Sequence, residues 1–208
     1  MSVVVLGAGG HAAVVLEILL AGRVDVVGLT DASYDPERPR ELFGVPVIGT
    51  DDVLPELRRK GVDGAIVAIG DNAMRRRLGG MALSAGFRLV NAVHPHASVS
   101  PSVELASGVA VMAMAAVNAR AKIGEGVIVN TGASVDHDCE IGPYSHLAPG
   151  SRLGGTVRCG HEVLVGIGAS VIPGMTIGDR ATIGAGAAVI DDVPAGATVV
   201  GVPARPRP

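Results

Sequence analysis

The sequence predicts two domains, a small α/β domain with a parallel sheet over residues 1–92 and an all-β parallel β-helix over residues 93–208. Two observations predict this division. Short apolar runs alternate with segments of helical composition in the first part, and the hydrophobic period changes to six residues in the second. A chain of 208 residues is long enough for two domains that each bury a core.

The first domain is expected to alternate strands with helices, which favours a parallel sheet. Gly22 and Gly61 are the expected ends of the first two helices, and Thr50 is the expected N-cap of the second. The expected strands are residues 2–7, 25–29, 45–49, 64–70 and 87–93, and the expected helices are residues 10–22, 51–61 and 71–86.

The second domain repeats a six-residue unit from Val99 to Val189 without an insertion or a deletion. A small residue stands two positions before each aliphatic one almost throughout, and Met175 is the main exception. Each unit predicts a short strand and a corner, and both columns are expected to point inward. The aliphatic column is Val99, Leu105, Val111, Val117, Ile123, Val129, Val135, Ile141, Leu147, Leu153, Cys159, Val165, Val171, Ile177, Ile183 and Val189.

Both cysteines fall in these columns, Cys139 in the small one and Cys159 in the aliphatic one. They are therefore expected to be buried as small hydrophobic residues without a catalytic role. Their separation fits neither a paired metal site nor a disulfide framework, so no metal is expected.

The composition argues against several classes of partner. The net charge is -3 and only 2% of the residues are aromatic, which disfavours nucleic acid as a ligand. No apolar stretch approaches the roughly 18 residues of a membrane span. The first residues break at glycine and lack the basic region of a signal peptide, so we expect a cytoplasmic protein without membrane contact.

The stretch "ASVDHDCEIGPYSH" places His137 at a corner of the predicted helix. Three units make one coil, so residues 18 positions apart stack about 4.8 Å apart on neighbouring coils. His137 therefore lies beside Gly155, whose backbone amide carries no Cβ to obstruct a ligand. A general base next to an oxyanion donor is what acyl transfer requires. Asp136 or Asp138 could orient the imidazole, although a purely solvated corner would have the same composition.

A second histidine, His146, lies half a coil further on and also faces outward. His137 and His146 are therefore expected on opposite sides of one prism. They could share a site only between subunits, which predicts an oligomer, most simply a homotrimer. His161 is expected to be a surface residue without a partner at stacking distance, and His94 and His96 are expected to be structural.

The chain resembles the bacterial nucleotide-sugar N-acetyltransferases of the left-handed β-helix superfamily and the related sialic acid O-acetyltransferases. The resemblance rests on "GAGGHA", Asp31, "AIGDNAMRR", "VDHDCEIGPYSHLAPG" and "GVPAR", and it covers nearly the whole chain. It implies a Rossmann-like nucleotide-sugar-binding domain, a left-handed β-helix acetyltransferase domain with a C-terminal tail, acetyl-CoA as cosubstrate, and a homotrimer with active sites between subunits.

The resemblance also implies the role of each residue in the acetyl transfer. His137 is the general base, Asp138 orients it, and the Gly155 amide stabilises the oxyanion. His146 contacts acetyl-CoA from a neighbouring subunit. The family often has glutamate at position 138, which leaves Asp136 as an alternative orienting residue.

Two binding regions follow from the same resemblance. Coenzyme A is expected along a groove between prisms, with Arg205 and Arg207 as candidate ligands of its phosphates. The nucleotide-sugar is expected in the first domain, with its diphosphate near the glycine loop and Asp31 at the base or ribose. The expected cofactor ligands are His146, Gly166, Ile167, Gly184, Ala185 and Arg205, and the expected substrate ligands are Gly9, Gly10, His11, Asp31, Asn72 and Arg75.

The sequence therefore predicts an acetyl-CoA-dependent N-acetyltransferase of glycan biosynthesis acting on a nucleotide-linked amino sugar, with a UDP-4-amino-4,6-dideoxy sugar as the first candidate. Transfer to a hydroxyl of sialic acid is one alternative. An NAD-binding sensor is another, because Gly7, Gly9 and Ala12 satisfy a G-x-G-x-x-A spacing after a strand. A zinc hydratase of β-helix architecture fits poorly, since its histidines would need a closer pair than His137, His146 and His161 provide.

Overall fold

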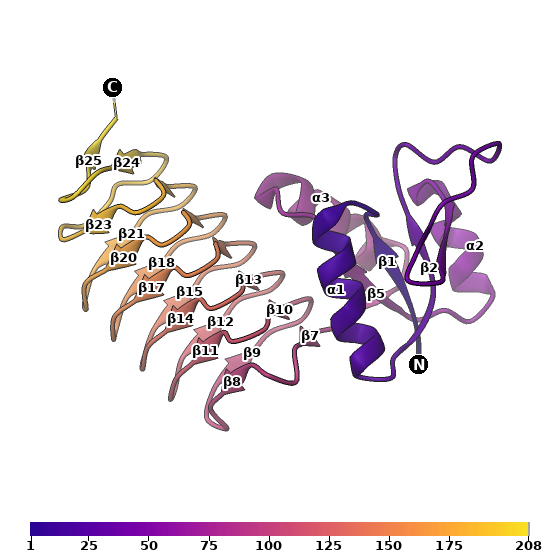
Figure 1. Ribbon diagram of the computed structural model, residues 1–208, viewed down its shortest axis with the longest axis horizontal. Coiled ribbons are helices and arrows are strands. Elements are labelled where there is room, and N and C mark those ends of the chain that lie inside the picture. The colour runs from indigo at the N-terminus through magenta and orange to yellow at the C-terminus, as the bar shows by residue number, and fades with distance from the viewer. Residues whose placement is uncertain (208) are drawn as a thin grey trace. The chain divides into compact units, whose positions relative to one another are not determined.

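The computed structural model describes residues 1–207, which form two compact units that divide after Pro95. The first unit is a small parallel-sheet domain and the second is a left-handed parallel β-helix, so the predicted fold class is confirmed (Figure 1). In the described part of the chain, none of the helices has the length and apolar character needed to cross a membrane.

The sheet of the first unit follows the strand order β3-β4-β2-β1-β5-β6, with β1 at its centre. Its strands are parallel except β3, which pairs antiparallel with β4. Residues 3–6 of β1 are completely buried, which explains why this strand is a continuous run of valine and leucine. The strands are β1 (Ser2–Leu6), β2 (Asp25–Thr30), β3 (Glu41–Leu42), β4 (Val45–Gly49), β5 (Gly64–Val67) and β6 (Arg88–Leu89), and β7 (Ala92–Val93) follows.

Three α-helices accompany this sheet, α1 (Gly10–Ala21), α2 (Leu54–Arg59) and α3 (Asn72–Ser84). Asp71 caps α3 because its carboxylate accepts the N–H of Met74 at 2.7 Å. Thr50 is the N-cap residue of the 3-10 turn Asp51–Val53 that leads into α2, but its hydroxyl donates to Asp52 and caps no backbone N–H.

The second unit winds around three parallel sheets whose strands are mostly two residues long. Partners on successive coils are 18 residues apart through most of the helix, as the pairs Lys122–Glu140 and Ser134–Arg152 illustrate, and 16 apart where β22 pairs with β24. The first sheet contains β10 (Ala110–Val111), β13 (Ile128–Val129), β16 (His146–Leu147), β19 (Leu164–Val165), β22 (Thr182–Ile183) and β24 (Thr198–Val200), with β25 (Arg205–Pro206) antiparallel at its end. The second contains β8 (Ser98–Val99), β11 (Ala116–Val117), β14 (Ser134–Val135), β17 (Arg152–Leu153), β20 (Ser170–Val171) and β23 (Ala188–Val189). The third contains β9 (Glu104–Leu105), β12 (Lys122–Ile123), β15 (Glu140–Ile141), β18 (Arg158–Cys159) and β21 (Thr176–Ile177).

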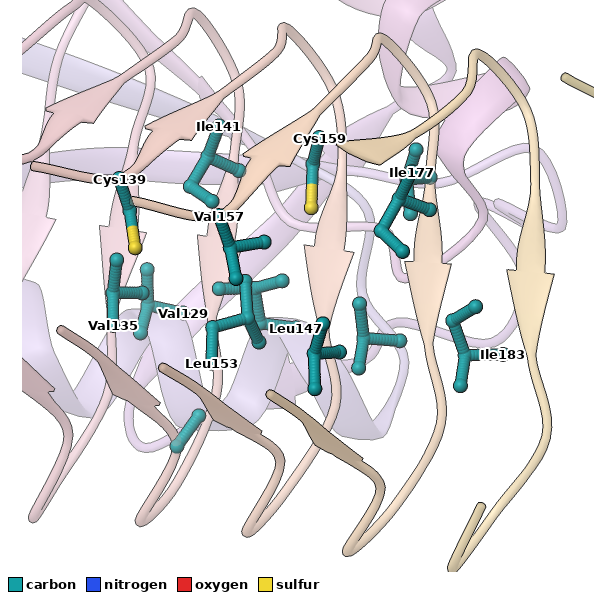
Figure 2. Packing of buried hydrophobic residues seen from close by; sticks show 14 of the residues in the cluster. Val129, Val135, Cys139, Ile141, Leu147, Leu153, Val157, Cys159, Ile177 and Ile183 are labelled. Atoms are coloured by element: carbon teal, nitrogen blue, oxygen red, sulfur yellow. The ribbon is translucent and has the colours of Figure 1, made fainter. Parts of the chain in front are cut away.

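The two inward columns of the repeat form the core of the β-helix. Figure 2 shows aliphatic side chains of successive coils stacked in its interior, with the sulfur atoms of Cys139 and Cys159 among them. Both cysteines are buried, so that prediction is confirmed. Burial raises the pKa of the Cys159 thiol to about 12 and also raises that of Cys139, so both stay protonated at neutral pH.

The corners between the sheets often contain one residue in the left-handed region of backbone space. Glycine takes this place at several corners, but Arg120, Asp138 and Glu162 adopt it with φ of 59°, 58° and 56°. A residue other than glycine is uncommon in this conformation. The corners therefore place charged side chains where the chain reverses, and two of these corners hold a histidine next to an acid.

Candidate active site

His137 lies in the corner between β14 and β15, and the residues on both sides of it fix its position. The carboxylate of Asp136 accepts the backbone N–H of His137 at 2.8 Å and a side-chain N–H of Asn118 at 3.0 Å. The His137 carbonyl accepts the N–H of Thr156 from the next coil at 2.9 Å. The backbone that carries the imidazole is therefore hydrogen-bonded to the coils before and after it.

Asp138, and not Asp136, reaches the ring of His137. Its Oδ2 lies 2.8 Å from the imidazole Nδ1. Hydrogen bonds from Arg120, and then from His137, hold the pKa of Asp138 far below its usual range, so the carboxylate is ionised and accepts. Nδ1 must therefore carry the proton, and in the neutral ring Nε2 is the basic nitrogen.

The Nε2 side of His137 lies against Gly155 of the next coil. A Cβ placed on Gly155 would stand 2.6 Å from both Cε1 and Nε2 of the ring, so any other residue here would force the ring to move. The side chain of His137 is 53% exposed, and its Nε2 has no hydrogen-bond partner among residues 1–207. The Gly155 N–H likewise donates to no acceptor in this described range. An exposed proton acceptor and a backbone N–H that makes no hydrogen bond within residues 1–207 thus lie on neighbouring coils, with Gly155 itself buried.

Arg120 is part of this cluster, and the sequence analysis missed it. Its Nε and Nη2 donate to the two carboxylate oxygens of Asp138 at 2.7 and 2.8 Å, in the bidentate geometry that arginine favours. Arg120 precedes Asp138 by 18 positions, the same spacing that joins His137 to Gly155. That spacing could have identified it.

His146 lies on β16 in the first sheet, so a single chain does not bring it together with His137. Its Nε2 is 2.9 Å from the amide nitrogen of Asn130. The amide oxygen of Asn130 accepts the N–H of Thr131 at 2.8 Å, which fixes the amide orientation and makes its nitrogen the donor to His146. Nε2 of His146 is therefore engaged by Asn130.

The expected coenzyme A ligands lie at two successive corners of the same edge. Gly166 is glycine for a packing reason, since a Cβ there would lie 2.6 Å from the carbonyl oxygen of Ile183. Ile167 beside it is 62% exposed, which is unusual for a large aliphatic side chain. Gly184 and Ala185 follow one coil later. Arg205 forms an ion pair of 3.2 Å with Asp191, so this side chain is engaged in the present structure.

Asp31 stands at the carboxyl end of β2, next to the glycine loop that follows β1. Its Oδ2 accepts the N–H of Ala8 at 3.1 Å, and its Oδ1 accepts the N–H of Ser33 at 2.9 Å. Partial burial alone would raise its pKa, but the hydrogen bonds from Ser33 and Ala8 and the charge of Arg40 lower it overall. Asp31 is therefore an ionised acceptor at the opening of this loop.

The glycine loop leads into the N-terminus of α1. A Cβ at Gly9 or Gly10 would meet no atom within 4 Å, so packing within the chain does not require these glycines. Burial, and then the charge of Arg75, lower the pKa of His11 to about 4, so its imidazole is neutral at pH 7. A cavity of about 180 Å³ lies beside the loop and is lined in part by Asp31.

Arg75 does not face this cavity, contrary to the expectation that it binds substrate. It is 1% exposed, and its Nη1 donates to the carbonyls of Ile69 and Gly70 at 3.0 Å each. Its Nη2 donates to Asn72 at 2.8 Å. The arginine that lines the cavity is Arg77, which directly precedes the buried Leu78 in α3.

No group of three or more histidine, cysteine, aspartate or glutamate side chains is arranged to hold a metal ion within residues 1–207.

Two family models match the chain. The PglD N-terminal domain matches residues 2–80, and the bacterial transferase hexapeptide (six repeats) matches residues 120–155. Among curated proteins, the serine acetyltransferase of Synechococcus elongatus is 40% identical over 70 residues. The alignments span 22%, 29% and 30% of the length of the curated relatives, so each match covers less than a third of the relative.

Solved structures match over the full length. GDP-perosamine N-acetyltransferase from Caulobacter crescentus, in complex with CoA and GDP-perosamine, is 48% identical with a TM-score of 0.97, and the match covers 100% of this chain and 97% of that one. The acetyltransferase domain of PglB from Neisseria gonorrhoeae, in complex with acetyl coenzyme A, is 40% identical with a TM-score of 0.93, covering 99% and 98%.

A third structure, WeeI from Acinetobacter baumannii, is 25% identical with a TM-score of 0.86 and full coverage of both chains. The matches therefore extend over both units and not only over the common hexapeptide repeat. The chain belongs to the left-handed β-helix family of nucleotide-sugar N-acetyltransferases, enzymes that transfer an acetyl group from acetyl-CoA to the amino group of a nucleotide-linked sugar.

Proposed function

We propose that this protein acetylates the amino group of GDP-perosamine or a closely similar nucleotide-linked amino sugar, with acetyl-CoA as donor. The observation that carries the proposal is the exposed His137 imidazole, whose Nε2 has no hydrogen-bond partner in residues 1–207, stacked against Gly155, whose N–H makes no hydrogen bond in the same range. The 48% identical Caulobacter enzyme, solved with CoA and GDP-perosamine, makes guanine the first nucleotide base to test. The uridine sugar expected from the resemblance stays in the panel as the alternative.

The proposed reaction is a direct transfer in a ternary complex. The sugar nitrogen attacks the thioester carbonyl, and Nε2 of His137 accepts the proton that this nitrogen loses. The ionised Asp138 stabilises the imidazolium, and the Gly155 N–H donates to the carbonyl oxygen as it becomes negative. The tetrahedral intermediate then collapses, the C–S bond breaks, and coenzyme A leaves as the thiolate.

A covalent acetyl-enzyme is not part of this proposal. Both cysteines are buried with raised pKa values, so neither supplies a thiolate to attack the thioester. Kinetics with both substrates varied should therefore give intersecting lines, as expected for a sequential mechanism, and not the parallel lines of a ping-pong mechanism.

We propose that the active unit is a homotrimer in which His137 and His146 of different subunits meet. The support is their separation on one chain, since His146 lies on β16 of the first sheet and His137 lies in the corner between β14 and β15. His146, whose Nε2 is held by the Asn130 amide, would contact acetyl-CoA bound at the neighbouring subunit. Coenzyme A would then pass the exposed Ile167 and its neighbours at the same edge.

The nucleotide-sugar is proposed to lie at the glycine loop of the first unit. Asp31 would accept from the base or ribose, and the diphosphate would meet the N–H groups at the start of α1 near Gly9 and Gly10. Arg77, which lines the adjacent cavity, replaces Arg75 as the cationic candidate. The acceptor class supports a place in glycan biosynthesis in the cytoplasm.

The test is an acetyl-transfer assay with acetyl-CoA and a panel of GDP-, UDP- and dTDP-linked amino sugars, with sialic acid as the hydroxyl acceptor. We expect thiol release with an amino-sugar nucleotide and none with sialic acid. Transfer only to sialic acid would establish the O-acetyltransferase alternative. Binding of NADH without binding of acetyl-CoA would favour the sensor.

The shared site has its own test. Separately purified His137→Asn and His146→Asn variants, mixed under conditions that exchange subunits, should regain activity because some sites then receive both intact histidines. Mass measurement by light scattering should give three chains. A mixture that stays as inactive as its components, in trimers proven to have exchanged, would contradict the intersubunit arrangement.

A further inference from the structure

Asp138 is held on two sides at once, and this arrangement extends beyond the His137 pair. One of its oxygens, Oδ2, contacts Nδ1 of His137 at 2.8 Å and also accepts from Arg120 at 2.8 Å. The other oxygen accepts from Nε of Arg120 at 2.7 Å. The carboxylate therefore cannot rotate without breaking at least one of these contacts.

The backbone of Arg120 is itself fixed. Its N–H donates to the hydroxyl of Ser102 at 3.1 Å, one coil earlier on the same edge. Ser102, Arg120 and Asp138 thus form a column of residues spaced 18 apart that ends at the imidazole. An exposed ion pair usually contributes little, but bidentate geometry on a fixed backbone is the exception.

Other charges surround this column, and none of them pairs with Asp138 in the described residues. A hollow of about 440 Å³ in the third sheet lies beside it, and Asp136 faces the backbone of His137 from the other side. The charged residues that line the hollow are Glu104, Arg120, Lys122, Asp138, Glu140 and Arg158. The other four charged residues of the hollow are two acids and two bases, so their charges sum to zero. Arg120 is therefore the residue whose positive charge offsets the negative charge of Asp138.

We propose that Arg120 is a positioning residue for the general base: it holds the Asp138 carboxylate against Nδ1 of His137 and limits how strongly that carboxylate attracts a proton to the ring. This inference rests on the proposed role of His137 in acetyl transfer. Arg120 touches neither substrate; it acts through Asp138.

Removing the guanidinium has two consequences of different kinds. The carboxylate becomes free to rotate, so a smaller fraction of the imidazole is held with Nε2 toward the substrate, and kcat falls. The negative charge of Asp138 also loses its partner and stabilises the imidazolium more strongly. The acid limb of the pH–rate profile, below which the base is protonated and inactive, should then move to higher pH.

The experiment compares Arg120→Met, Arg120→Lys and the matched control Arg158→Met, which removes a positive charge from the same hollow without touching Asp138. We expect Arg120→Met to lower kcat about tenfold at little change in the KM for acetyl-CoA. Its acid limb should rise by about half a pH unit, the order expected when one exposed charge near the ring is removed. In Arg120→Lys the acid limb of the pH–rate profile should stay near its wild-type pH, because the positive charge remains.

A second readout does not depend on the acceptor. The chemical shift of the His137 ring proton on Cε1, followed by NMR against pH, should show its midpoint displaced upward in Arg120→Met and unchanged in Arg158→Met. If Arg120→Met and Arg158→Met behave alike in this titration and in kcat, while both melt at the wild-type temperature, the proposal is overturned.

The two proposals fail in different ways. A wild-type protein that acetylates no amino-sugar nucleotide, but still shows the displaced His137 midpoint in Arg120→Met, refutes the proposed function and keeps the Arg120–Asp138–His137 coupling. Normal transfer by the wild type with no displacement in Arg120→Met does the reverse. A variant that melts early is replaced by Arg120→Gln, for which the same midpoint is read.

Discussion

Two corners of the β-helix carry the same local motif, a histidine followed by an acid in the left-handed conformation. In one, Asp138 has φ of 58° and contacts Nδ1 of His137 at 2.8 Å; in the other, Glu162 has φ of 56° and contacts Nδ1 of His161 at 3.1 Å. The difference lies one coil further on. Position 155 is glycine, whereas the equivalent position after His161 is Asp179.

Asp179 closes the second corner. Its Oδ2 lies 3.1 Å from Nε2 of His161, and its Oδ1 accepts the backbone N–H of the same residue at 3.0 Å. His161 is thereby held between two carboxylates and joins neighbouring coils, whereas Nε2 of His137 stays open above Gly155. The comparison shows that in these two corners the residue 18 positions later determines whether Nε2 of the histidine is bound by a carboxylate or left without a partner in the described residues.

The sharpest way to break this comparison is to replace each histidine by asparagine. We expect His137→Asn to lower kcat by about 10² to 10⁴-fold, the usual contribution of a general base. His161→Asn should leave kcat within about twofold, because its ring faces carboxylates and no open donor. Steady-state kinetics of both variants, with circular dichroism to confirm folding, makes the measurement. Equal losses of kcat in the two variants would contradict the proposed difference between the His137 and His161 corners.

Gly155→Ala sharpens the comparison from the other side of the ring. The added Cβ would lie 2.6 Å from Nε2 and Cε1 of His137, so the ring must turn away, and we expect a loss of about tenfold to hundredfold in kcat. Gly80→Ala in α3, where a Cβ meets nothing within 4 Å, is the matched control and should keep full activity. Full activity of Gly155→Ala would mean that the ring position beside Gly155 is not needed.

Asp138→Asn tests which aspartate orients the base. The neutral amide keeps the shape but turns an N–H toward either Arg120 or His137, and it no longer stabilises the imidazolium, so kcat should fall about tenfold or more. Asp136→Asn, whose native contacts are to backbone and to Asn118, should cost less. A larger loss in Asp136→Asn than in Asp138→Asn would reverse the assignment.

The smallest expected effect is on stability in acid. The pKa of Asp138 is lowered in the folded chain, so its contribution to stability is present above the ordinary value of 3.8 and is lost as the pH falls below it. Thermal unfolding between pH 5 and pH 2 should therefore decline more steeply in the wild type than in Asp138→Asn. Parallel curves for the two proteins would show that the ion pair with Arg120 does not stabilise the fold.

Much of the β-helix could be predicted because its period is strict. The six-residue columns identified the core, both buried cysteines and the stacking of His137 on Gly155. The same 18-residue spacing joins Arg120 to Asp138 and His161 to Asp179, yet both pairs were missed, and His161 was wrongly expected to lack a partner. The 18-residue spacing is visible in the sequence. Whether two side chains at this spacing touch depends on the direction that a corner in the left-handed conformation gives them.

The first unit was less predictable at its site. Arg75, Arg76 and Arg77 are consecutive, and helical periodicity alone did not show which one faces inward. The carbonyls of Ile69 and Gly70 at the end of β5 decide it, because they bury the guanidinium of Arg75 and leave Arg77 at the cavity. Hydrogen bonds between a helix side chain and carbonyls outside that helix cannot be inferred from the periodicity of the helix sequence.

The most direct test of His137 as the base is a crystal structure of the His137→Asn variant with CoA and GDP-perosamine bound. A histidine-to-asparagine variant of the Caulobacter enzyme was solved with both of these ligands, so the experiment is practicable. We predict the sugar amino nitrogen within about 3 Å of the side chain at position 137, with the coenzyme sulfur beside the Gly155 N–H. A sugar bound away from this corner, with its amine at His161 or in solvent, would contradict it.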